Sequence, residues 1–448
     1  MSEFVRRSRV NAPPHEVFAW HARPGAFERL VPPWEAIRVI ERTGGIEDGA
    51  RAVLELRVGP VPIRWTAEHS GYVAGRQFVD EQRGGPFRQW RHTHSMLPDP
   101  PDGSVLEDRI EYTLPFGAVG ALFDPLAVAP RLARTFGYRH RVTRDDIDTH
   151  RRYAHAGTLR VAITGSSGLI GSRLVPLLTT GGHHVTRLRR GGAGFEMDPA
   201  ILDGVDSVVH LAGANVAAHR WTEPWKREIA DSRIGLTRRL AETLAARERP
   251  PRVLVCASAI GIYGHRPCET LTEASDPGTG FLADVCRDWE AAAQPARDAG
   301  IRVVSLRFGI VLSPSGGALA QLLPVFRLGV GGRLGRGDMS MSWIEADDAA
   351  GAVYHALATP ALEGSVNATA PAPVTNAEFT RVLARTVRRP AFVSVPAAAL
   401  RLAVGEMADA ALLSSAHVEP ARLVSTGYHF RFPELGPALA HVLGSARL

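Results

Sequence analysis

A glycine-rich turn between an apolar strand and a helix constrains this 448-residue chain more than any other feature. The turn reads TGSSGLIG, from Thr164 to Gly171, and it lies between the apolar run LRVAIT and the segment LIGSRLVPLLTT. Gly165 permits a tight reversal, Gly168 lets the backbone approach a bound group, and Gly171 lets helix and strand pack closely. Unpaired amides and the positive dipole at the helix start favour a phosphate. The motif predicts a dinucleotide pyrophosphate site, and a turn without a ligand is the alternative.

Apolar strands alternate with helices from residue 158 onward. The strand candidates are LRVAIT, HHVTRL, SVVHLAG, RVLVCASA and IRVVSLRF, and helical segments such as RIGLTRRLAETLAARE and DVCRDWEAAAQPARDA lie between them. Short apolar strands that alternate with helices are typical of a parallel sheet covered on both faces. We therefore predict the α/β fold class, with a Rossmann-type doubly wound parallel sheet.

The first 150 residues have a different pattern. A strand at 4–13 and a helical segment precede six alternating segments, separated by glycine and proline, at 37–43, 50–58, 63–73, 77–83, 88–97 and 105–114. Strands at this spacing indicate an antiparallel sheet. A long helix should follow from about Leu122, with the stretches YRHR and THRR, between residues 138 and 152, on its solvent face. This order predicts an α+β domain whose curved sheet grips a helix, followed by a linker at 150–158.

The strand after the glycine-rich turn distinguishes between two cofactors. NAD-binding domains usually place Asp or Glu about 20 residues further on, where it bonds the ribose 2′-hydroxyl. Here the strand ends in Arg187-Leu188-Arg189-Arg190, and the first acidic residue is Glu196. Guanidinium groups match a 2′-phosphate through paired, charge-assisted hydrogen bonds. Arg187 and Arg190 therefore favour NADP(H), and a solvated arginine run is the alternative.

Composition excludes several other classes of protein. The formal charge is +6, but the arginines are spread along the chain without a basic block, so we expect no nucleic-acid partner. The three cysteines, Cys256, Cys268 and Cys286, fit neither a disulfide framework nor a zinc module. No apolar run approaches the roughly 18 residues that span a bilayer, and the N-terminus does not resemble a signal peptide. A soluble cytoplasmic protein without membrane insertion is expected, and its oligomeric state stays open.

One acidic cluster offers oxygen ligands for a metal ion. Glu345, Asp347 and Asp348 lie together in the segment WIEADDAA. Carboxylates in the first turn of a helix are also stabilised by the helix dipole, and we favour this interpretation. The sequence therefore predicts no metal site.

Further motifs, in order along the chain, resemble those of the epimerase-like proteins among the atypical or extended short-chain dehydrogenase/reductases. After TGSSGLIG they are HLAGANV, RWTEPWKREIADSR, ASAIGIYG, FLADVCRDWEAAA, LRFGIVLSPSGGAL, MSWIEADDAA and VNATAPAPVTNAEF. The resemblance covers about residues 158–440. It implies an NADP-binding epimerase-like domain at 158–390 and, at 391–448, the small C-terminal module of one subfamily.

The same resemblance implies where a cofactor and a substrate would lie. The segment from His210 to Gly213 would end the fourth strand along the cofactor, Phe308-Gly309-Ile310 would lie near the nicotinamide, and residues 314–335 would cover the substrate. The expected cofactor contacts are Thr164, Gly165, Ser167, Gly168, Leu169, Ile170, Gly171, Arg187, Arg190, Leu211, Ala212 and Gly213.

The N-terminal region, residues 1–152, is similar to the helix-grip superfamily of START-like and polyketide-cyclase-like domains. The segments VNAPPHEVFAWHARPGAFERLVPPW and FRQWRHTHSM carry this resemblance. Such domains enclose an apolar cavity between sheet and long helix, which implies an apolar ligand. Trp20, Trp34 and Trp90 could line the cavity, although large aromatic residues are more often part of an ordinary core, and we favour that interpretation.

The chain departs from its superfamily at the catalytic helix. Typical members carry Tyr-x-x-x-Lys there, but FLADVCRDWE contains neither residue, and Lys226 is the only lysine in the chain. The resemblance makes Ser258 the active-site serine. Tyr263 could be an acid if it reaches the site, and Arg287 could supply positive charge, as alternatives to simple packing and solvation. Asp284 and Cys286 of the same helix are further candidates.

Two functions follow from these observations. The first is an NADP-dependent oxidoreductase or epimerase that acts on a small alcohol, ketone or sugar-like substrate. The second is a non-catalytic protein in which NADP(H) occupancy reports redox state and the helix-grip domain carries a ligand. The glycine-rich turn, Ser258 and the segment Ser315-Gly316-Gly317 favour the first, and the missing Tyr/Lys pair favours the second.

Overall fold

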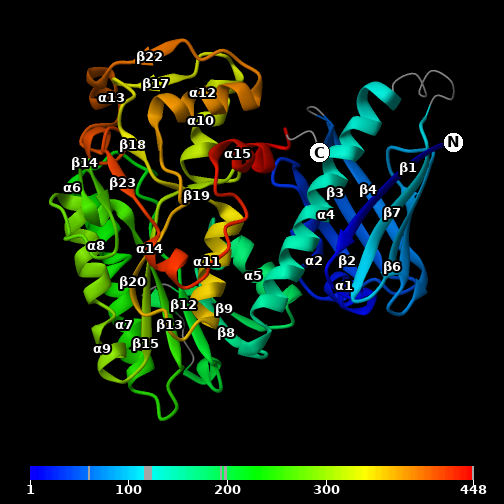
Figure 1. Cartoon of the computed structure of the whole chain (residues 1–448), viewed down its shortest axis with the longest axis horizontal. Helices are drawn as coiled ribbons and strands as arrows, with labels where there is room; N and C mark the ends of the chain where they lie inside the picture. Colours follow the sequence, from blue (N-terminus) through cyan, green and yellow to red (C-terminus); the bar gives the residue numbers. More distant parts are fainter. Residues whose placement is uncertain (59–60, 116–123, 192–193, 196–198, 446–448) are drawn as a thin grey trace. The chain divides into compact units, whose positions relative to one another are not determined.

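The computed structural model describes residues 1–58, 61–115, 124–191, 194–195 and 199–445. It divides into two compact units (Figure 1). The first comprises Met1–Ala154 with Thr179–Gly182 and His441–Leu448, and the second comprises His155–Leu178 with His183–Ala440. No helix among the described residues combines the length and the apolar character needed to cross a membrane.

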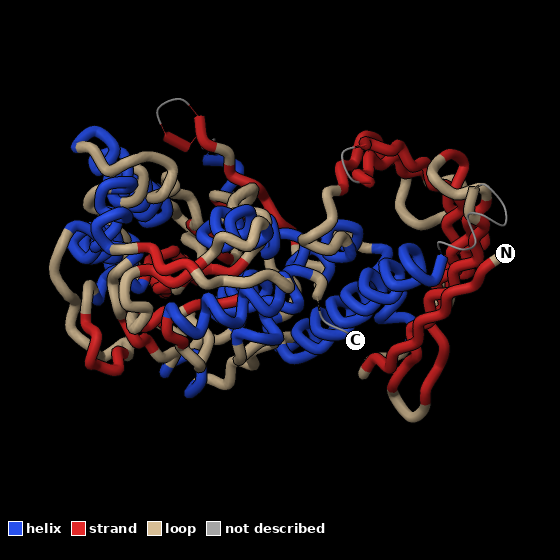
Figure 2. The backbone as a smooth tube through the Cα atoms, turned by 90° about the horizontal axis from the view of Figure 1, so that it is seen from above, coloured by secondary structure: helices blue, strands red, loops and turns tan. Residues whose placement is uncertain are grey.

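The N-terminal unit is built on one seven-stranded antiparallel sheet with the order β1-β7-β6-β5-β4-β3-β2. Its strands are β1 (Ser2–Val10), β2 (Ile37–Thr43), β3 (Arg51–Val58), β4 (Val61–Val73), β5 (Gln77–Gly84), β6 (Gln89–Asp99) and β7 (Gly103–Thr113). Its helices are α1 (Pro14–Ala22), α2 (Ala26–Leu30) and α4 (Ala129–Arg152), with a π-turn at Asp124–Val128. The predicted sheet gripping a long helix is confirmed, and Figure 2 shows α4 running beside the strands. The predicted helix start at Leu122 lies outside the described residues.

Helix α4 buries a polar stripe that sequence reasoning placed in solvent. In the stretch YRHR, Tyr138 and His140 are both buried, and in THRR so is Thr149. Within these two stretches only Arg151 and Arg152, at the end of the helix, are exposed. The expectation of a solvent face was therefore wrong for this stretch, because 3.6-residue periodicity turns every third or fourth residue of the helix toward the sheet.

The three tryptophans proposed for a cavity do not share one. Trp20 packs in a cluster with Phe78 and Met96. Trp90 belongs to a separate cluster with Phe136, and Trp34 makes an edge contact with Tyr138 at 5.1 Å between ring centroids. The favoured interpretation, ordinary core, fits Trp20 and Trp90.

The second unit contains a six-stranded parallel sheet with the order β20-β15-β13-β12-β8-β9, which confirms the predicted Rossmann-type fold. The strands are β8 (Arg160–Thr164), β9 (His184–Leu188), β12 (Ser207–His210), β13 (Val253–Ala259), β15 (Arg302–Phe308) and β20 (Gly364–Ala368). The helices are α5 (Gly171–Thr180), α6 (Glu223–Asp231), α7 (Ile234–Ala245), α8 (Phe281–Ala291), α9 (Gln294–Asp298), α10 (Gly317–Arg327), α11 (Ala346–Ala358), α12 (Asn376–Val387), α13 (Ala397–Val404), α14 (Ala421–Ser425) and α15 (Leu435–Leu443). Of these, α7, α8 and α9 lie on one side of the sheet and α5 and α11 on the other (Figure 1).

Short strand pairs attach the later part of the chain to this sheet. They join β14 (Arg266–Leu271) to β23 (Ala416–Val418), β16 (Ile310–Leu312) to β19 (Trp343–Glu345), β17 (Gly332–Leu334) to β22 (Val393–Val395), β18 (Ser340–Met341) to β21 (Val374–Thr375), and β10 (Arg190–Gly191) to β11 (Gly194–Phe195). The pairs β14–β23 and β17–β22 link residues beyond 391 to the Rossmann core. The C-terminal segment is thereby part of this compact unit.

The strand order positions a binding crevice. The chain passes from β8 to its neighbour β9 and then returns past β8 to β12 on the other side. At such a reversal the connections leave in opposite directions, and a crevice opens at the carboxyl ends of the two strands. His210 therefore ends the third strand of the sheet in chain order, and Ser258 lies in the fourth. The expected fourth strand for His210 was wrong because the described residues between β9 and β12 form only the short β10–β11 hairpin and a 3-10 turn at Pro199–Leu202.

Candidate functional site

The glycine-rich turn lies in this crevice, packed against the end of β12. Gly165 has φ +68°, and a Cβ there would lie 2.7 Å from the carbonyl carbon of Leu211. A Cβ on Gly171 would collide with the carbonyl oxygen of Gly165 and with the Ser166 backbone. Side chains are therefore excluded at both positions, which leaves the turn narrow enough for a ligand to reach the backbone.

The backbone amides of the turn are available to an anion. Gly168 N–H donates to Gly165 O at 2.9 Å, and Ser172 N–H donates to Gly168 O at 2.9 Å. Within the described residues, the amides of Ser167, Leu169 and Ile170 form no such bond. They precede α5, whose positive dipole end adds to the attraction. These residues fit the diphosphate of a dinucleotide.

Thr164 and the residues after β12 form the floor of the crevice. The hydroxyl of Thr164 is fully buried and lies 2.7 Å from His210 Nδ1, and it accepts a 3.4 Å bond from Ala212 N–H. Burial lowers the pKa of His210 to about 4, so the imidazole is neutral. Thr164 thus ties the ends of β8 and β12 together, and Leu211, Ala212 and Gly213 continue along the crevice.

Two arginines stand at the neighbouring strand end. Arg187 pairs in register with Ile163 of β8, two residues before Gly165, and Arg189 follows β9 directly. Both are exposed, and within the described part of the chain neither guanidinium has a hydrogen-bond or ion-pair partner. The side chain of Arg190, the other predicted contact, lies outside the described residues.

The segment after β15 closes the opposite side. Gly309 packs against Ser342 O and Thr369. Gly316 and Gly317, at the start of α10, lie so close to Leu169 that a Cβ on either would be 3.2–3.3 Å from its methyl groups. The glycine-rich segment expected over the substrate therefore touches the glycine-rich turn.

Ser258 forms part of a buried ionic network. Its hydroxyl donates to Glu290 Oε1 of α8 at 2.7 Å. Arg307 of β15 holds the same carboxylate with two bonds, Nε to Oε1 at 2.8 Å and Nη2 to Oε2 at 2.9 Å. Ser365 of β20 completes the set, donating to Glu290 Oε2 at 2.8 Å and accepting from Arg307 at 2.9 Å. Although burial raises the pKa of Glu290, its bonds to Arg307 dominate and hold the pKa below the usual value.

Tyr263 joins this network from the other side. Its hydroxyl accepts from Arg307 Nη1 at 2.9 Å and lies 2.7 Å from Asn367 Oδ1 and 3.0 Å from Thr272 O. The ring is fully buried, and burial raises the pKa of the phenol. The structure thus brings Ser258 and Tyr263 together, but through Arg307 and inside the domain.

Arg287 does not join them. It is exposed on α8, where it pairs with Asp284 at 2.8 Å. Its neighbour Cys286 is buried, and burial raises the pKa of its thiol to about 12, so it is no nucleophile.

The face of α8 that looks toward the end of β13 carries Leu282 and Cys286, four residues apart. A Cβ on Gly261, just after β13, would meet Leu282 Cβ at 3.4 Å and Cys286 Sγ at 3.9 Å.

Sequence reasoning missed one cationic residue near this face of α8, Arg233. Arg233, before α7, donates to Ala214 O at 2.9 Å and to Ile229 O at 3.1 Å, and lies against Gly213. The only feature of the sequence that pointed to Arg233 was its position at the end of the motif RWTEPWKREIADSR, just before a predicted helix.

The acidic cluster WIEADDAA is a helix start, as favoured. Glu345 caps α11 by accepting from Asp347 N–H at 2.6 Å and Asp348 N–H at 3.2 Å. Asp347 pairs with Arg173 at 3.0 Å, and Asp348 accepts from Tyr428.

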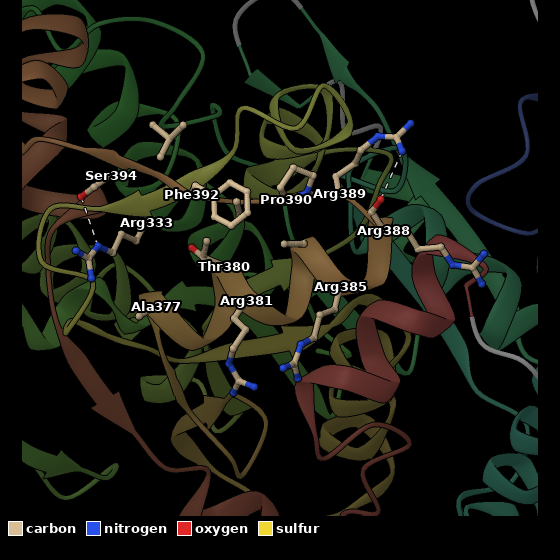
Figure 3. Close-up of a pocket in the computed structure, with 13 residues that line it drawn as sticks. Arg333, Ala377, Thr380, Arg381, Arg385, Arg388, Arg389, Pro390, Phe392 and Ser394 are labelled. Atoms are coloured by element: carbon tan, nitrogen blue, oxygen red, sulfur yellow. Dashed lines mark hydrogen bonds between the residues drawn. The ribbon is translucent and has the colours of Figure 1, made fainter.

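A separate groove of about 600 Å³ is lined by arginines of α12 and its surroundings. Figure 3 shows Arg381 and Arg385 on α12, Arg388 and Arg389 at its C-terminal end, and Phe392 nearby. Arg333, within the segment 314–335, donates to Ser394 at 3.4 Å at one edge of the groove, where β17 and β22 pair. The groove suits an anionic group, but its lining includes no residue of the glycine-rich turn.

A turn of glycines at the switch point of a parallel sheet defines a dinucleotide-binding Rossmann protein, here joined to a helix-grip domain. Comparisons with known proteins agree. Residues 161–368 match the NAD dependent epimerase/dehydratase family, residues 395–442 match a domain of unknown function, and residues 10–140 match polyketide cyclases/dehydrases and lipid transport proteins.

This chain matches two relatives over almost the whole length of each relative. An epimerase family protein of Mycobacterium bovis is 44% identical over 292 residues, which are 63% of this chain and 96% of the relative. Human epimerase family protein SDR39U1 is 36% identical over 295 residues, 64% of this chain and 100% of the relative. The chain therefore belongs to the SDR39U1-like epimerase family.

Solved structures extend the likeness. The structure described as the nucleoside-diphosphate sugar epimerase from Corynebacterium glutamicum is 33% identical, with TM-score 0.81 over 98% of this chain and 90% of that one. Human SDR39U1, crystallised with NADPH, is 34% identical, with TM-score 0.60 over 64% of this chain and 99% of that one. The first of these spans both units in one chain.

Proposed function

We propose that the Rossmann unit binds NADP(H) in preference to NAD(H) and uses it in hydride transfer with a small alcohol, ketone or sugar-like substrate. One observation carries the cofactor choice. Arg187, in the strand beside the glycine-rich turn, and Arg189, just after it, are exposed and have no partner among the described residues, at a place where an NAD-binding domain usually has a carboxylate. The NADPH in the human SDR39U1 crystal supports the same choice.

In this proposal, different residues of the chain bind different parts of the dinucleotide. The amides of Ser167, Leu169 and Ile170 bind the diphosphate, and Gly165, Gly168 and Gly171 leave room for it. Leu211, Ala212 and Gly213 lie along it, and Arg187 with Arg189, joined by Arg190, binds the 2′-phosphate. Thr164 is a positioning residue, because its hydroxyl ties β12 to β8.

Bound NADPH would supply the hydride. The chain then has to orient the substrate, exclude water and stabilise charge on the substrate oxygen. Segment 314–335 closes over the crevice through Gly316 and Gly317. Arg233 offers a guanidinium beside Gly213, on the side of α8 where Leu282 and Cys286 replace the usual tyrosine and lysine. It would stabilise negative charge without donating a proton.

A non-catalytic, redox-reporting function is the second candidate, and a specific observation favours it. The three residues expected to be catalytic are occupied elsewhere: Ser258 bonds Glu290, Tyr263 bonds Arg307, and Arg287 pairs with Asp284 at the surface. A protein of this kind would bind NADPH tightly, and no substrate would cause it to oxidise the NADPH.

For the helix-grip unit we propose a small apolar ligand. Its match to polyketide cyclases and lipid transport proteins supports this. Binding of a fluorescent fatty acid analogue to the full chain, with no displacement by excess unlabelled lipid, would count against it.

Calorimetry on the purified full chain tests the cofactor proposal. NADPH should bind at least tenfold tighter than NADH. Arg187→Ala and Arg189→Ala should each weaken NADPH by about tenfold, or about 1.4 kcal/mol, and leave NADH unchanged. Arg252→Ala is the matched control, because Arg252 is an equally exposed arginine at the opposite end of the sheet, just before β13. Equal affinity for the two cofactors refutes the proposal.

Turnover separates the two functions. With NADPH and a panel of carbonyl compounds, loss of reduced-cofactor absorbance supports the oxidoreductase, and Arg233→Ala should then lower kcat more than Arg233→Lys. Tight binding without oxidation of NADPH by any compound supports the redox-reporting protein.

A further inference from the structure

The helix-grip unit carries a buried cluster of histidines and aspartates that the proposed function does not use. Asp80 of β5, His92 and His94 of β6, and Asp108 of β7 lie on one face of three adjacent strands. The register places Asp80 opposite His92 and Asp108 opposite His94. Such cross-strand neighbours have Cβ atoms about 4.5–5.5 Å apart. The sheet itself therefore holds these four side chains together.

Three of these side chains converge on one point. Asp80 Oδ1 lies 3.0 Å from His92 Nδ1 and 3.2 Å from His94 Nε2, and all three atoms lie within 4.8 Å of one another. An ion about 2.0–2.1 Å from each of its ligands separates tetrahedral ligands by about 3.3 Å and octahedral ligands by about 3 Å. The two short separations match that range.

We propose that Asp80, His92 and His94 bind a divalent transition-metal ion of the zinc or ferrous iron class. Two imidazoles and one carboxylate are a donor set that both ions accept. Three protein ligands leave at least one coordination position for water or for an oxygen of a bound ligand. The site is independent of the cofactor crevice, so either proposal can fail without the other.

Asp108 lies beside both imidazoles, next to the ring nitrogens that do not face Asp80. Its Oδ1 lies 2.9 Å from His92 Nε2 and 2.7 Å from His94 Nδ1, the nitrogens that do not face Asp80. Its Oδ2 lies 2.6 Å from His140 Nε2 on α4. Metal-binding histidines commonly donate their other nitrogen to a carboxylate, which fixes the ring and strengthens the ligand. Asp108 does this for His92 and lies within 2.7 Å of His94 Nδ1, and His140 fixes Asp108.

A purely ionic cluster explains these contacts less well. His94 Nδ1 lies 2.7 Å from Asp108 but without hydrogen-bond alignment. His140 Nδ1 is also buried without a hydrogen bond in the described part of the chain. Buried polar atoms are seldom left unsatisfied, so hydrogen bonds among the described residues do not fully account for these imidazoles. Two carboxylates also match the charge of a divalent cation.

Aromatic rings protect the cluster, and Asp80 is the most exposed of its four side chains. Phe78 stacks on His94 with ring centroids 4.1 Å apart, and Phe136 meets His92 edge-on at 5.0 Å. The side chains of His92, His94 and Asp108 are 3–8% exposed, but that of Asp80 is 18% exposed. An ion would reach the site past Asp80.

Zinc binding to untagged, chelator-stripped full-length protein tests the proposal, with competition by a chromophoric chelator as the readout. We expect one tight equivalent of Zn²⁺, no tight equivalent in Asp80→Asn or His94→Gln, and about 10–100-fold weaker binding in Asp108→Asn. His15→Ala is the control, since His15 is an exposed histidine of the same unit. Absence of a tight equivalent in the wild type, or equal binding by wild type and Asp80→Asn, overturns the proposal.

Two further measurements cover variants that fail to fold. Co²⁺ in the wild-type protein should give the visible absorption of a low-symmetry site with nitrogen and oxygen ligands. Zn²⁺ should slow amide hydrogen exchange in β5 and β6 of the wild-type chain. A Co²⁺ spectrum like that of the aqueous ion, or protection confined to other segments, overturns the proposal without any variant.

Discussion

Each unit buries a cluster of charged side chains, but the two clusters differ in how they are satisfied. In the Rossmann unit, Arg307 and Glu290 share two hydrogen bonds, and Ser258, Ser365 and Tyr263 take up the remaining positions. In the helix-grip unit, Asp108 holds three imidazoles, yet His94 Nδ1 and His140 Nδ1 lack aligned partners.

This difference separates a structural network from a binding site. Burying charge is costly, so a network that satisfies every donor and acceptor within the protein needs nothing more. A cluster that leaves donors and acceptors facing each other without alignment is complete only with something added. The same criterion favours a structural role for Ser258 and Tyr263 and supports a candidate metal site at Asp80, His92 and His94.

The largest effect should come from breaking the closed network. Glu290→Leu leaves the buried guanidinium of Arg307 without its carboxylate, which costs about 3–5 kcal/mol. Local stability would be read by hydrogen exchange and mass spectrometry on the full chain, in β13 and β15. The loss should be confined to the Rossmann unit.

Two controls calibrate that result. Glu290→Leu with Arg307→Met removes both charges and should recover most of the loss. Glu378→Gln breaks the exposed pair of Glu378 with Arg381 and should cost less than about 1 kcal/mol. A loss in Glu290→Leu no larger than in Glu378→Gln would contradict the structural interpretation.

The open cluster should respond to metal where the closed one does not. Zn²⁺ at about 100 times its dissociation constant would stabilise the helix-grip unit by about 2.7 kcal/mol, because it binds only the folded state. Hydrogen exchange should slow in β5, β6 and β7 and stay unchanged in β13, β15 and β20. Similar protection in both units would show that the ion acts on the whole chain and not on this cluster.

The sequence predicts what is local. The turn from Thr164 to Gly171 and the alternation of apolar strands with helices determine backbone geometry within a few residues, so the parallel sheet and its crevice could be predicted. The strand numbering was one too high because the described residues between β9 and β12 form only the short β10–β11 hairpin and a turn of helix at Pro199–Leu202, and no strand of the sheet.

Long-range pairing could not be predicted in the same way. Ser258, Glu290, Arg307 and Ser365 come from four elements, and no spacing relates them. Two signals were nevertheless present. Arg307 lies in the apolar strand IRVVSLRF, where a charge must find a partner. His92 and His94, two residues apart in a strand, necessarily share a face.

Removing Ser258 should weaken the closed network by a smaller amount. Ser258→Ala loses one hydrogen bond to a carboxylate that Arg307 still holds, at a cost of about 1.5–2 kcal/mol in β13. Ser365→Ala is the matched variant, since its hydroxyl also donates to Glu290. Affinity for NADPH should stay within twofold in both. Unchanged stability with abolished turnover in Ser258→Ala alone would restore the serine to the catalytic set.

Lowering the pH should produce the smallest loss of stability, and it should show whether Glu290 is the carboxylate that causes this loss. The bonds to Arg307 hold the pKa of Glu290 below its usual value of 4.5, so the unfolded chain takes up the proton first. Glu290 therefore stabilises the Rossmann unit above pH 4.5, and this contribution is lost as the pH falls through the folded pKa. Hydrogen exchange in β13 and β15, corrected for the intrinsic rate, should show this loss in the wild type. Glu290→Gln cannot ionise and should lack that component, and parallel profiles for the two proteins would assign the acid sensitivity to another carboxylate.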